Sequence, residues 1–182
     1  MRSINIWLLI KLQNLLPKLL ITRFVNKIAR IKYPPIKNFL IEKFINLYEI
    51  NTEEVKKVIP IDFDTFNDFF IRELKKDARP IPQSEKTICS PVDGTLTVYG
   101  DINEETLIQA KNHDYLLQDL VCRPKNEINQ FVNGQFSTIY LAPFNYHRVH
   151  SPIDGRITRI DHTPGNLFSV NKITTEFIPE VF

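Results

Sequence analysis

Two of the four histidines in this 182-residue chain stand three positions apart, at His147 and His150, with Arg148 between them. Imidazole exchanges a proton near neutral pH, so such a pair is suited to general acid–base chemistry. Two other interpretations stay open on spacing alone. With one carboxylate the pair would supply the three protein ligands of a catalytic zinc site, although no His-Glu-x-x-His pattern accompanies it. The histidines could also be structural side chains of a polar turn.

A short repeat adds a carboxylate to the same chemistry. Ser-Pro-Ile-Asp-Gly at residues 151–155 matches Ser-Pro-Val-Asp-Gly at residues 90–94, where Asp93 takes the acidic position. Pro-x-Asp-Gly is ordinary turn chemistry, and that explanation is sufficient for Asp154. A complete Ser-His-Asp hydrolase is not indicated, because the chain has no Gly-x-Ser-x-Gly elbow.

Helices are expected ahead of these motifs. Leucines recur on one helical face from Leu8 to Leu19, and Pro17 should kink or divide this segment. A second helix is predicted around Phe24–Arg30. A third starts near Pro35, and its predicted apolar stripe consists of Ile36, Phe39, Leu40, Phe44 and Leu47.

Two further short helices are predicted before the chain changes character. The first covers Asn51–Val58. The second covers Asp64–Leu74, is capped by Asp64 or Thr65, and has Asp68 in a capping-box position. Pro80 and Pro82 then stop the helical region.

Short β-like runs separated by turns follow Ile81. The predicted strands are Thr87–Cys89, Thr95–Tyr99, Thr106–Gln109, Phe136–Leu141, Arg156–Asp161 and Leu167–Val170. One inserted helix is expected between His113 and Val121. The fold class predicted is therefore α+β: N-terminal amphipathic helices followed by a mostly antiparallel, β-barrel-like sheet.

Charge is distributed unevenly along the chain. Residues 1–40 hold eight basic and no acidic side chains, whereas the other residues hold 15 basic and 21 acidic ones. No apolar run reaches the roughly 20 residues of a membrane span, and no cleavage site of a secretory signal follows an apolar segment. A basic amphipathic segment with Trp7 near its start is typical of the interface of an anionic bilayer. Helices packed on the domain are the alternative, and the ordered leucines argue against nucleic acid.

The run Tyr-Leu-Ala-Pro-Phe-Asn-Tyr-His-Arg-Val-His at residues 140–150 resembles the signature of phosphatidylserine decarboxylase, a pyruvoyl-dependent family. Further segments resemble that family in the same order, and the basic start is typical of its bacterial long form. These segments are Phe66–Arg72, Arg79–Ile81, Pro91–Gly94, Ile108–Lys111 with His113, and Pro164–Asn171. Ala142 and Asn145 depart from it, because the family often has hydroxyl and acidic residues there.

The resemblance implies a role for each candidate residue. Asp93 would be the carboxylate and His150 the base of a self-processing reaction, in which the precursor chain is cleaved at a serine. The new terminus becomes a pyruvoyl group, the electron sink of decarboxylation. His147 would act in decarboxylation, and Tyr140 would lie beside the substrate. No metal is expected.

The family's cleavage motif resembles Leu-Gly-Ser-Thr, and no Gly-Ser pair occurs in this sequence. We therefore expect a chain truncated before the cleavage site, with an incomplete sheet, that neither cleaves itself nor decarboxylates phosphatidylserine alone. Residues 1–80 would form a helical membrane-association region and residues 81–182 a partial β-rich catalytic domain.

The expected partners are an anionic membrane surface, phosphatidylserine, a C-terminal pyruvoyl-bearing alpha chain and a second copy of the chain in a homodimer. Nucleic acid is not expected as a partner. The expected location is peripheral, on the cytoplasmic face of the bacterial cell membrane. Three alternatives stay open: one half of a split enzyme, a non-catalytic membrane-binding module, and a zinc hydrolase.

Overall fold

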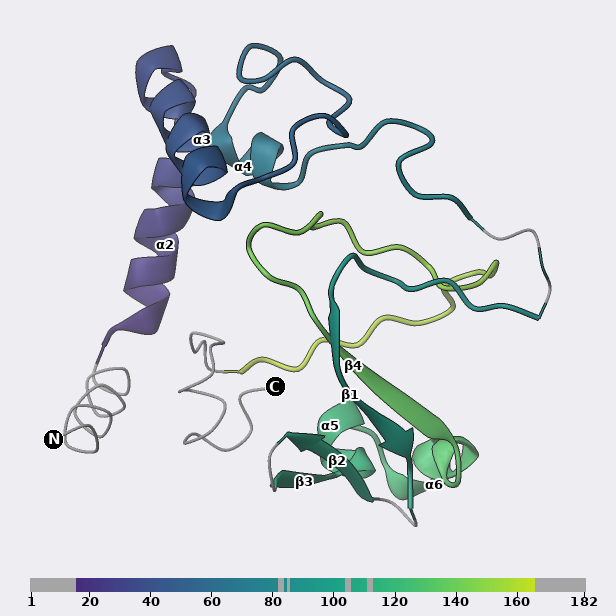
Figure 1. Ribbon diagram of the computed structural model, residues 1–182. Helices are drawn as coiled ribbons and strands as arrows, with labels where there is room; N and C mark the ends of the chain where they lie inside the picture. Colours follow the sequence, from purple (N-terminus) through teal and green to yellow (C-terminus); the bar gives the residue numbers. More distant parts are fainter. Residues whose placement is uncertain (1–15, 82–83, 85, 104–105, 111–112, 166–182) are drawn as a thin grey trace, which may run out of the picture. The chain divides into compact units, whose positions relative to one another are not determined.

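A computed structural model describes residues 16–81, 84, 86–103, 106–110 and 113–165, and its described residues form an α+β fold as predicted (Figure 1). The chain divides into two compact units. The unit that carries His147 and His150 comprises Arg23–Thr95 and Tyr140–Ile160 and is called the site unit below. The other, the strand unit, is built around Leu96–Ile139. The division into a membrane-association region, residues 1–80, and a partial catalytic domain, residues 81–182, stays a prediction.

Two helices open the described part of the chain, α2 (Lys18–Ala29) and α3 (Pro34–Tyr48). Both start at prolines, whose fixed φ and missing N–H suit a first helical turn: Pro17 immediately precedes α2, and α3 has prolines at its first positions. The helix predicted near Pro35 is confirmed, and the one around Phe24–Arg30 begins earlier than predicted. The segment before Pro17 lies largely outside the described residues.

Among the described residues, no helix has the length and apolar character needed to cross a membrane.

The buried face of α3 differs from the predicted stripe. Lys37 and Ile41 are buried, whereas Ile36, Phe39 and Leu47 are exposed. Lys37 can occupy the buried face because its Nζ donates to the carbonyl oxygens of Pro60 and Phe63, at 2.9 and 2.7 Å. This ammonium group is therefore satisfied inside the protein and is not part of a membrane-facing basic surface.

Helix α4 (Phe66–Phe70) begins as predicted, with Thr65 as the cap. The Thr65 hydroxyl accepts a hydrogen bond from the Asp68 N–H at 3.1 Å and donates to the Asp68 carboxylate at 2.9 Å. The helix presents Phe69, fully buried, to a core cluster that α3 completes. The buried members of this cluster are Ile41, Ile50, Val55, Phe63 and Phe69.

The helix predicted over Asn51–Val58 does not form, and α4 ends at Phe70, four residues before the predicted end. Instead Val55 and Leu74 form an isolated antiparallel bridge. The Lys56 N–H donates to the Glu73 carbonyl oxygen at 3.0 Å. Pairing with a distant segment and burial of Val55 thus outweigh the local helical preference.

The strand unit contains two small sheets, drawn in teal and green in Figure 1. Strand β1 (Thr95–Asp101) pairs with β4 (Gln135–Tyr140), and β2 (Thr106–Ala110) pairs antiparallel with β3 (His113–Leu116). Three short helical turns connect β3 to β4: α5 (Leu117–Val121), α6 (Lys125–Ile128) and a 3₁₀ turn at Asn129–Phe131. The buried centre of this unit comprises Ile102, Leu117 and Ile128.

Three of the predicted strands are confirmed, at β1, β2 and β4. The predicted strands Thr87–Cys89 and Arg156–Asp161 have no strand structure, and Leu167–Val170 lies outside the described residues. The helix predicted from His113 starts at Leu117, because residues 113–116 pair with β2 instead. The described strands form two-stranded sheets only, so a barrel-like sheet is not shown.

Candidate active site

The two Ser-Pro-x-Asp-Gly repeats lie side by side in the site unit. The Cys89 N–H donates to the Pro152 carbonyl oxygen at 3.0 Å, and the His150 N–H donates to the Pro91 carbonyl oxygen at 2.8 Å. Each repeat also closes on itself, since its serine hydroxyl donates to the carbonyl oxygen two residues later, at 2.7 Å in residues 90–94 and 2.5 Å in residues 151–155. The repeat seen in the sequence is thus a structural pair.

This pairing brings the predicted processing residues to one groove of about 990 Å³. Asp93 and His150 both line it, as does Tyr146. Apolar side chains provide part of the wall: Ile81, Ile88, Pro91, Val92, Pro152 and Ile153. A mixed lining of this kind, with a few convergent polar groups, is the usual character of a binding site.

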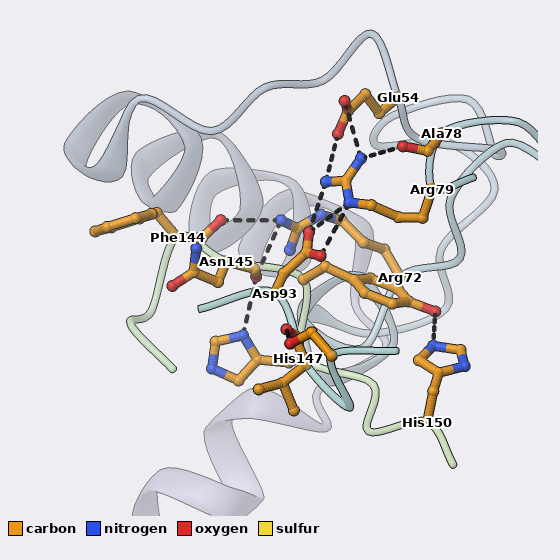
Figure 2. A network of polar contacts seen from close by, with 12 residues as sticks. Glu54, Arg72, Ala78, Arg79, Asp93, Phe144, Asn145, His147 and His150 are labelled. Atoms are coloured by element: carbon orange, nitrogen blue, oxygen red, sulfur yellow. Dashed lines mark hydrogen bonds and ion pairs between the residues drawn. The ribbon is translucent and has the colours of Figure 1, made fainter. Parts of the chain in front are cut away.

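Asp93 is held by an arginine that the sequence reasoning gave no role (Figure 2). The Arg79 Nε lies 2.9 and 2.8 Å from the two Asp93 carboxylate oxygens, and its Nη2 lies 2.6 Å from Oδ2. The other side of the same guanidinium donates to Glu54, from Nη1 at 3.1 Å and from Nη2 at 3.0 Å. Hydrogen bonds to Asp93 and then Glu54 raise the pKa of Arg79 above its ordinary value, which keeps the guanidinium charged.

Arg72 supports the histidine loop from within the protein. It is 3% exposed, and its Nη2 donates to the carbonyl oxygens of Phe144 and Asn145, both at 3.2 Å. Its guanidinium carbon lies 5.4 Å from the ring centre of Phe69. Burial lowers the pKa of Arg72, and the charges of Asp93 and Glu54 oppose this shift. Within the described residues, its Nε and Nη1 atoms have no hydrogen-bond partner.

Arg148, between the histidines, fixes the same loop from the other side. Its Nε donates to the Ile71 carbonyl oxygen at 2.9 Å, and its Nη1 lies 3.1 Å from a Glu73 carboxylate oxygen. Lys56 lies 2.9 Å from the second oxygen of that carboxylate. Hydrogen bonds from Lys56 and Arg148 lower the pKa of Glu73.

The tautomer of the neutral His147 ring follows from its partner. Its Nδ1 lies 2.9 Å from the Asn145 carbonyl oxygen, which only accepts hydrogen bonds, so Nδ1 carries the proton. In the neutral ring this leaves Nε2 as the nitrogen that can accept a proton. The ring packs on Phe70, with 4.1 Å between the ring centres. His147 is thus a partly buried imidazole with a fixed orientation.

His150 is exposed and is paired with a tyrosine. Its Nε2 lies 2.9 Å from the Tyr146 hydroxyl oxygen, and the two rings stack with their centres 5.5 Å apart. Within the described part of the chain, His150 and Asp93 share no hydrogen bond. Each instead has its own partner, Tyr146 and Arg79 respectively.

The remaining candidate, Tyr140, is the last residue of β4 and is partly buried. It does not line the groove. Asn145, one of the departures from the family pattern, accepts a hydrogen bond from the Ala142 N–H at 2.8 Å through its side-chain oxygen. An amide oxygen therefore serves there as an acceptor for the turn. Among the described residues, no group of three histidine, cysteine or acidic side chains is arranged to hold a metal ion.

Sequence reasoning missed Arg79, Glu54 and Tyr146 as parts of the site. A signal existed for Arg79, since it lies in one of the segments that carry the family resemblance. No comparable signal existed for Glu54, which is one of several acidic residues in a polar segment.

Comparison with known proteins covers most of the chain. The sequence model of a family described as phosphatidylserine decarboxylase matches residues 66–182, and one described as PSD matches residues 8–49. A phosphatidylserine decarboxylase proenzyme of Psychromonas ingrahamii is 45% identical over 93% of this chain and 59% of the relative. Proteins of the same name from Pseudoalteromonas translucida and Haemophilus ducreyi are 44% and 42% identical, over 95% and 93% of this chain. The chain spans about 60% of the length of these relatives.

Proposed function

This chain belongs to the phosphatidylserine decarboxylase family, and on that premise we propose that it forms the beta-chain portion of an enzyme that converts phosphatidylserine to phosphatidylethanolamine and carbon dioxide. The observation that carries the proposal is the hydrogen-bonded pairing of the two Ser-Pro-x-Asp-Gly segments. It brings Asp93 and His150 to the wall of one groove.

In the self-processing step, His150 acts as base on the hydroxyl of a serine supplied by the C-terminal alpha-chain portion, and Asp93 orients the imidazole. The serine oxygen attacks the carbonyl carbon of the preceding residue and displaces the serine nitrogen, so that the peptide bond becomes an ester. Loss of the serine Cα proton expels the carboxylate of the preceding residue, and hydrolysis of the resulting dehydroalanine releases ammonia and leaves the pyruvoyl group. His150 is suited to this part because it is exposed at the groove and its Nε2 is already within 2.9 Å of a hydroxyl, that of Tyr146. A serine hydroxyl would take the same kind of position.

The pyruvoyl group formed from that serine supplies the electron sink for decarboxylation. The groove fits such a group, because it combines apolar walls at Val92 and Ile153 with two groups that can form hydrogen bonds, the Tyr146 hydroxyl and the His150 imidazole. His147 handles the proton that replaces the lost carboxylate, through the Nε2 atom left available by its bond to Asn145. Tyr140 lies beside the substrate in this proposal.

The membrane surface is the proposed location, on the cytoplasmic face of the bacterial cell membrane. Helix α2 has no buried residues and exposes Leu19, Leu20, Phe24 and Val25. Basic side chains occur along the same helix, at Lys18, Arg23 and Lys27. Exposed apolar area together with basic charge favours the interface of an anionic bilayer.

Vesicle sedimentation tests this location. Binding to vesicles that contain an anionic lipid should weaken with added salt and with the double substitution Arg23→Glu and Lys27→Glu. Equal binding to uncharged phosphatidylcholine vesicles would contradict the electrostatic part of the proposal.

We further propose that the two-stranded sheets belong to a larger, antiparallel barrel-like sheet completed by the alpha chain. In support, residues in and beside the repeats expose large aliphatic side chains: Ile88, Val149, Ile153, Ile157 and Ile160 are each more than 60% exposed. The homodimer stays a prediction, for sedimentation analysis of the two-chain protein.

The decisive experiment is a chimera in which this chain continues into the C-terminal part of the Psychromonas ingrahamii relative, with its cleavage site. Intact mass should show cleavage into two chains, and the cleaved protein should release carbon dioxide from phosphatidylserine. Replacing the cleavage-site serine by alanine is the matched control, and Asp93→Asn and His150→Gln should each prevent cleavage. A chimera that melts cooperatively but is never cleaved would overturn the proposal. The 182-residue chain alone should show neither activity.

A further inference from the structure

Arg79 engages two carboxylates in a double fork, the most extensive set of side-chain hydrogen bonds among the described residues that line the groove (Figure 2). Its Nε and Nη2 donate to both oxygens of Asp93, and its Nη1 and Nη2 donate to both oxygens of Glu54. The three residues come from separate segments of the site unit. Glu54 lies 25 positions and Asp93 14 positions away from Arg79 in the sequence. A planar guanidinium held at both ends leaves little freedom of rotation to either carboxylate.

We propose that Arg79, held in place by Glu54, is a positioning residue for Asp93 in the self-processing reaction. The inference rests on the proposed function, because it concerns the carboxylate that orients the processing base. It adds two residues to that reaction, neither of which touches the reacting serine.

The pattern of acceptors supports a positioning role. A carboxylate has about four acceptor sites, two on each oxygen. Arg79 donates twice to Oδ2 of Asp93, from Nε and Nη2, and once to Oδ1. One acceptor site on Oδ1 is thus left for an imidazole N–H. The fork fixes the plane of the carboxylate without occupying the site that His150 would need.

Charge balance supports the same role. Asp93 and Glu54 together bring two negative charges to one guanidinium, and buried Arg72 supplies the second positive charge, since both carboxylates act on it electrostatically. The contacts are partly shielded, with the side chains of Arg79, Asp93 and Glu54 at 44%, 25% and 35% exposure. An isolated exposed ion pair contributes little, but bidentate geometry within a network is the recognised exception.

The second repeat provides an internal comparison. Asp154 occupies the place in residues 151–155 that Asp93 occupies in residues 90–94. It is exposed, and within the described part of the chain no arginine contacts it. The repeat therefore places a carboxylate in each turn, and only that of Asp93 is held in a fixed orientation by an arginine among the described residues.

The test uses the chimera described above and follows the rate of self-cleavage by intact mass. Arg79→Ala should slow cleavage by on the order of tenfold to a hundredfold, as expected when a reacting group is misplaced by about an ångström. Arg79→Lys should be intermediate, because it keeps the charge and loses the fork. Glu54→Gln should have a smaller effect. Guanidinium ion at tens of millimolar should restore part of the Arg79→Ala rate, whereas the same concentration of sodium chloride should not.

Arg30→Ala is the matched control, because it removes an exposed arginine of the same unit that donates to the Asn26 side-chain oxygen and does not line the groove. It should cleave at the unmodified rate. If the unmodified chimera is not cleaved, the proposed function fails and this inference fails with it. If the unmodified chimera and Arg79→Ala cleave equally fast, the inference alone is overturned. The inference would also be overturned if the self-cleavage rate fell in proportion to the melting temperature, fell equally for Arg79→Ala and Arg79→Lys, and did not respond to guanidinium ion. Arg79 would then contribute to stability only.

Discussion

Replacing Phe69 by alanine should unfold the support beneath the histidine loop. The ring is fully buried and has edge-to-face contacts with Phe63 and Phe44, whose ring centres lie 5.5 and 6.5 Å away. Its face also lies under the Arg72 guanidinium. Removing the ring therefore leaves a cavity between α3 and α4 and takes away the surface on which Arg72 rests.

The expected loss is about 4 kcal/mol, within the range of about 3–5 kcal/mol for Phe→Ala at a buried site. Ring pairs of this kind contribute about 0.5–1.5 kcal/mol beyond burial, which favours the upper half of the range. Since a whole domain is stable by only about 5–15 kcal/mol, this one ring is a large share of the stability of the site unit.

Amide hydrogen exchange measured by mass spectrometry suits a chain with two units, because it reports each segment separately. Phe69→Ala should raise exchange in α3 and also at residues 144–147, the loop segment in which Arg72 binds the carbonyl groups of Phe144 and Asn145. The matched control is Phe39→Ala, which removes the same side chain from a position that is 57% exposed on α3. The control should change stability by less than about 0.5 kcal/mol.

A result in which Phe69→Ala and Phe39→Ala cost the same would refute this reasoning. So would a Phe69→Ala chain with faster exchange in α3 but unchanged exchange at residues 144–147. The milder Phe69→Leu keeps the test usable if the alanine variant does not fold.

Three further outcomes are expected. Thr65→Ala should cost about 1 kcal/mol in a urea titration by circular dichroism, because it removes the cap of α4, whereas Thr65→Ser should cost less. Tyr146→Phe should change the nitrogen chemical shifts of the His150 ring in the 182-residue chain and slow self-cleavage of the chimera only a few-fold, since the phenol is a partner and not the base. Hydrogen bonds from Lys56 and Arg148 lower the pKa of Glu73 in the folded state. The ionised Glu73 carboxylate therefore stabilises the fold at pH values above its ordinary pKa of about 4.5, and this stabilisation is lost as the pH falls through the lower pKa of the folded state. The urea midpoint should therefore decline in acid, and Glu73→Gln should reduce that decline.

Local signals predicted the parts of the fold that local chemistry decides. A proline marked the start of α3, and Thr65 with Asp68 marked the start of α4, because both depend on residues within one helical turn. Short β-like runs bounded by turn residues located β1, β2 and β4 for the same reason.

Distant partners decided the features that were predicted wrongly. The face of α3 was wrong because Lys37 is buried, which depends on carbonyl groups 23 and 26 positions away. The helix at Asn51–Val58 was wrong because Val55 pairs with Leu74. No periodicity within a short window carries this information.

The candidate site divides in the same way. Its histidines and Asp93 stood out because a repeat and a close spacing are visible along the chain, and the structure places both copies of the repeat in one antiparallel pair. The two copies have the same internal hydrogen bond, so the repeat by itself would make Asp93 and Asp154 equivalent. The difference between them comes from outside the repeat, in the Arg79 fork and its partner Glu54. Asp93 is therefore the better candidate for a chemical role, because residues of separate segments, Arg79 and Glu54, fix the orientation of its carboxylate.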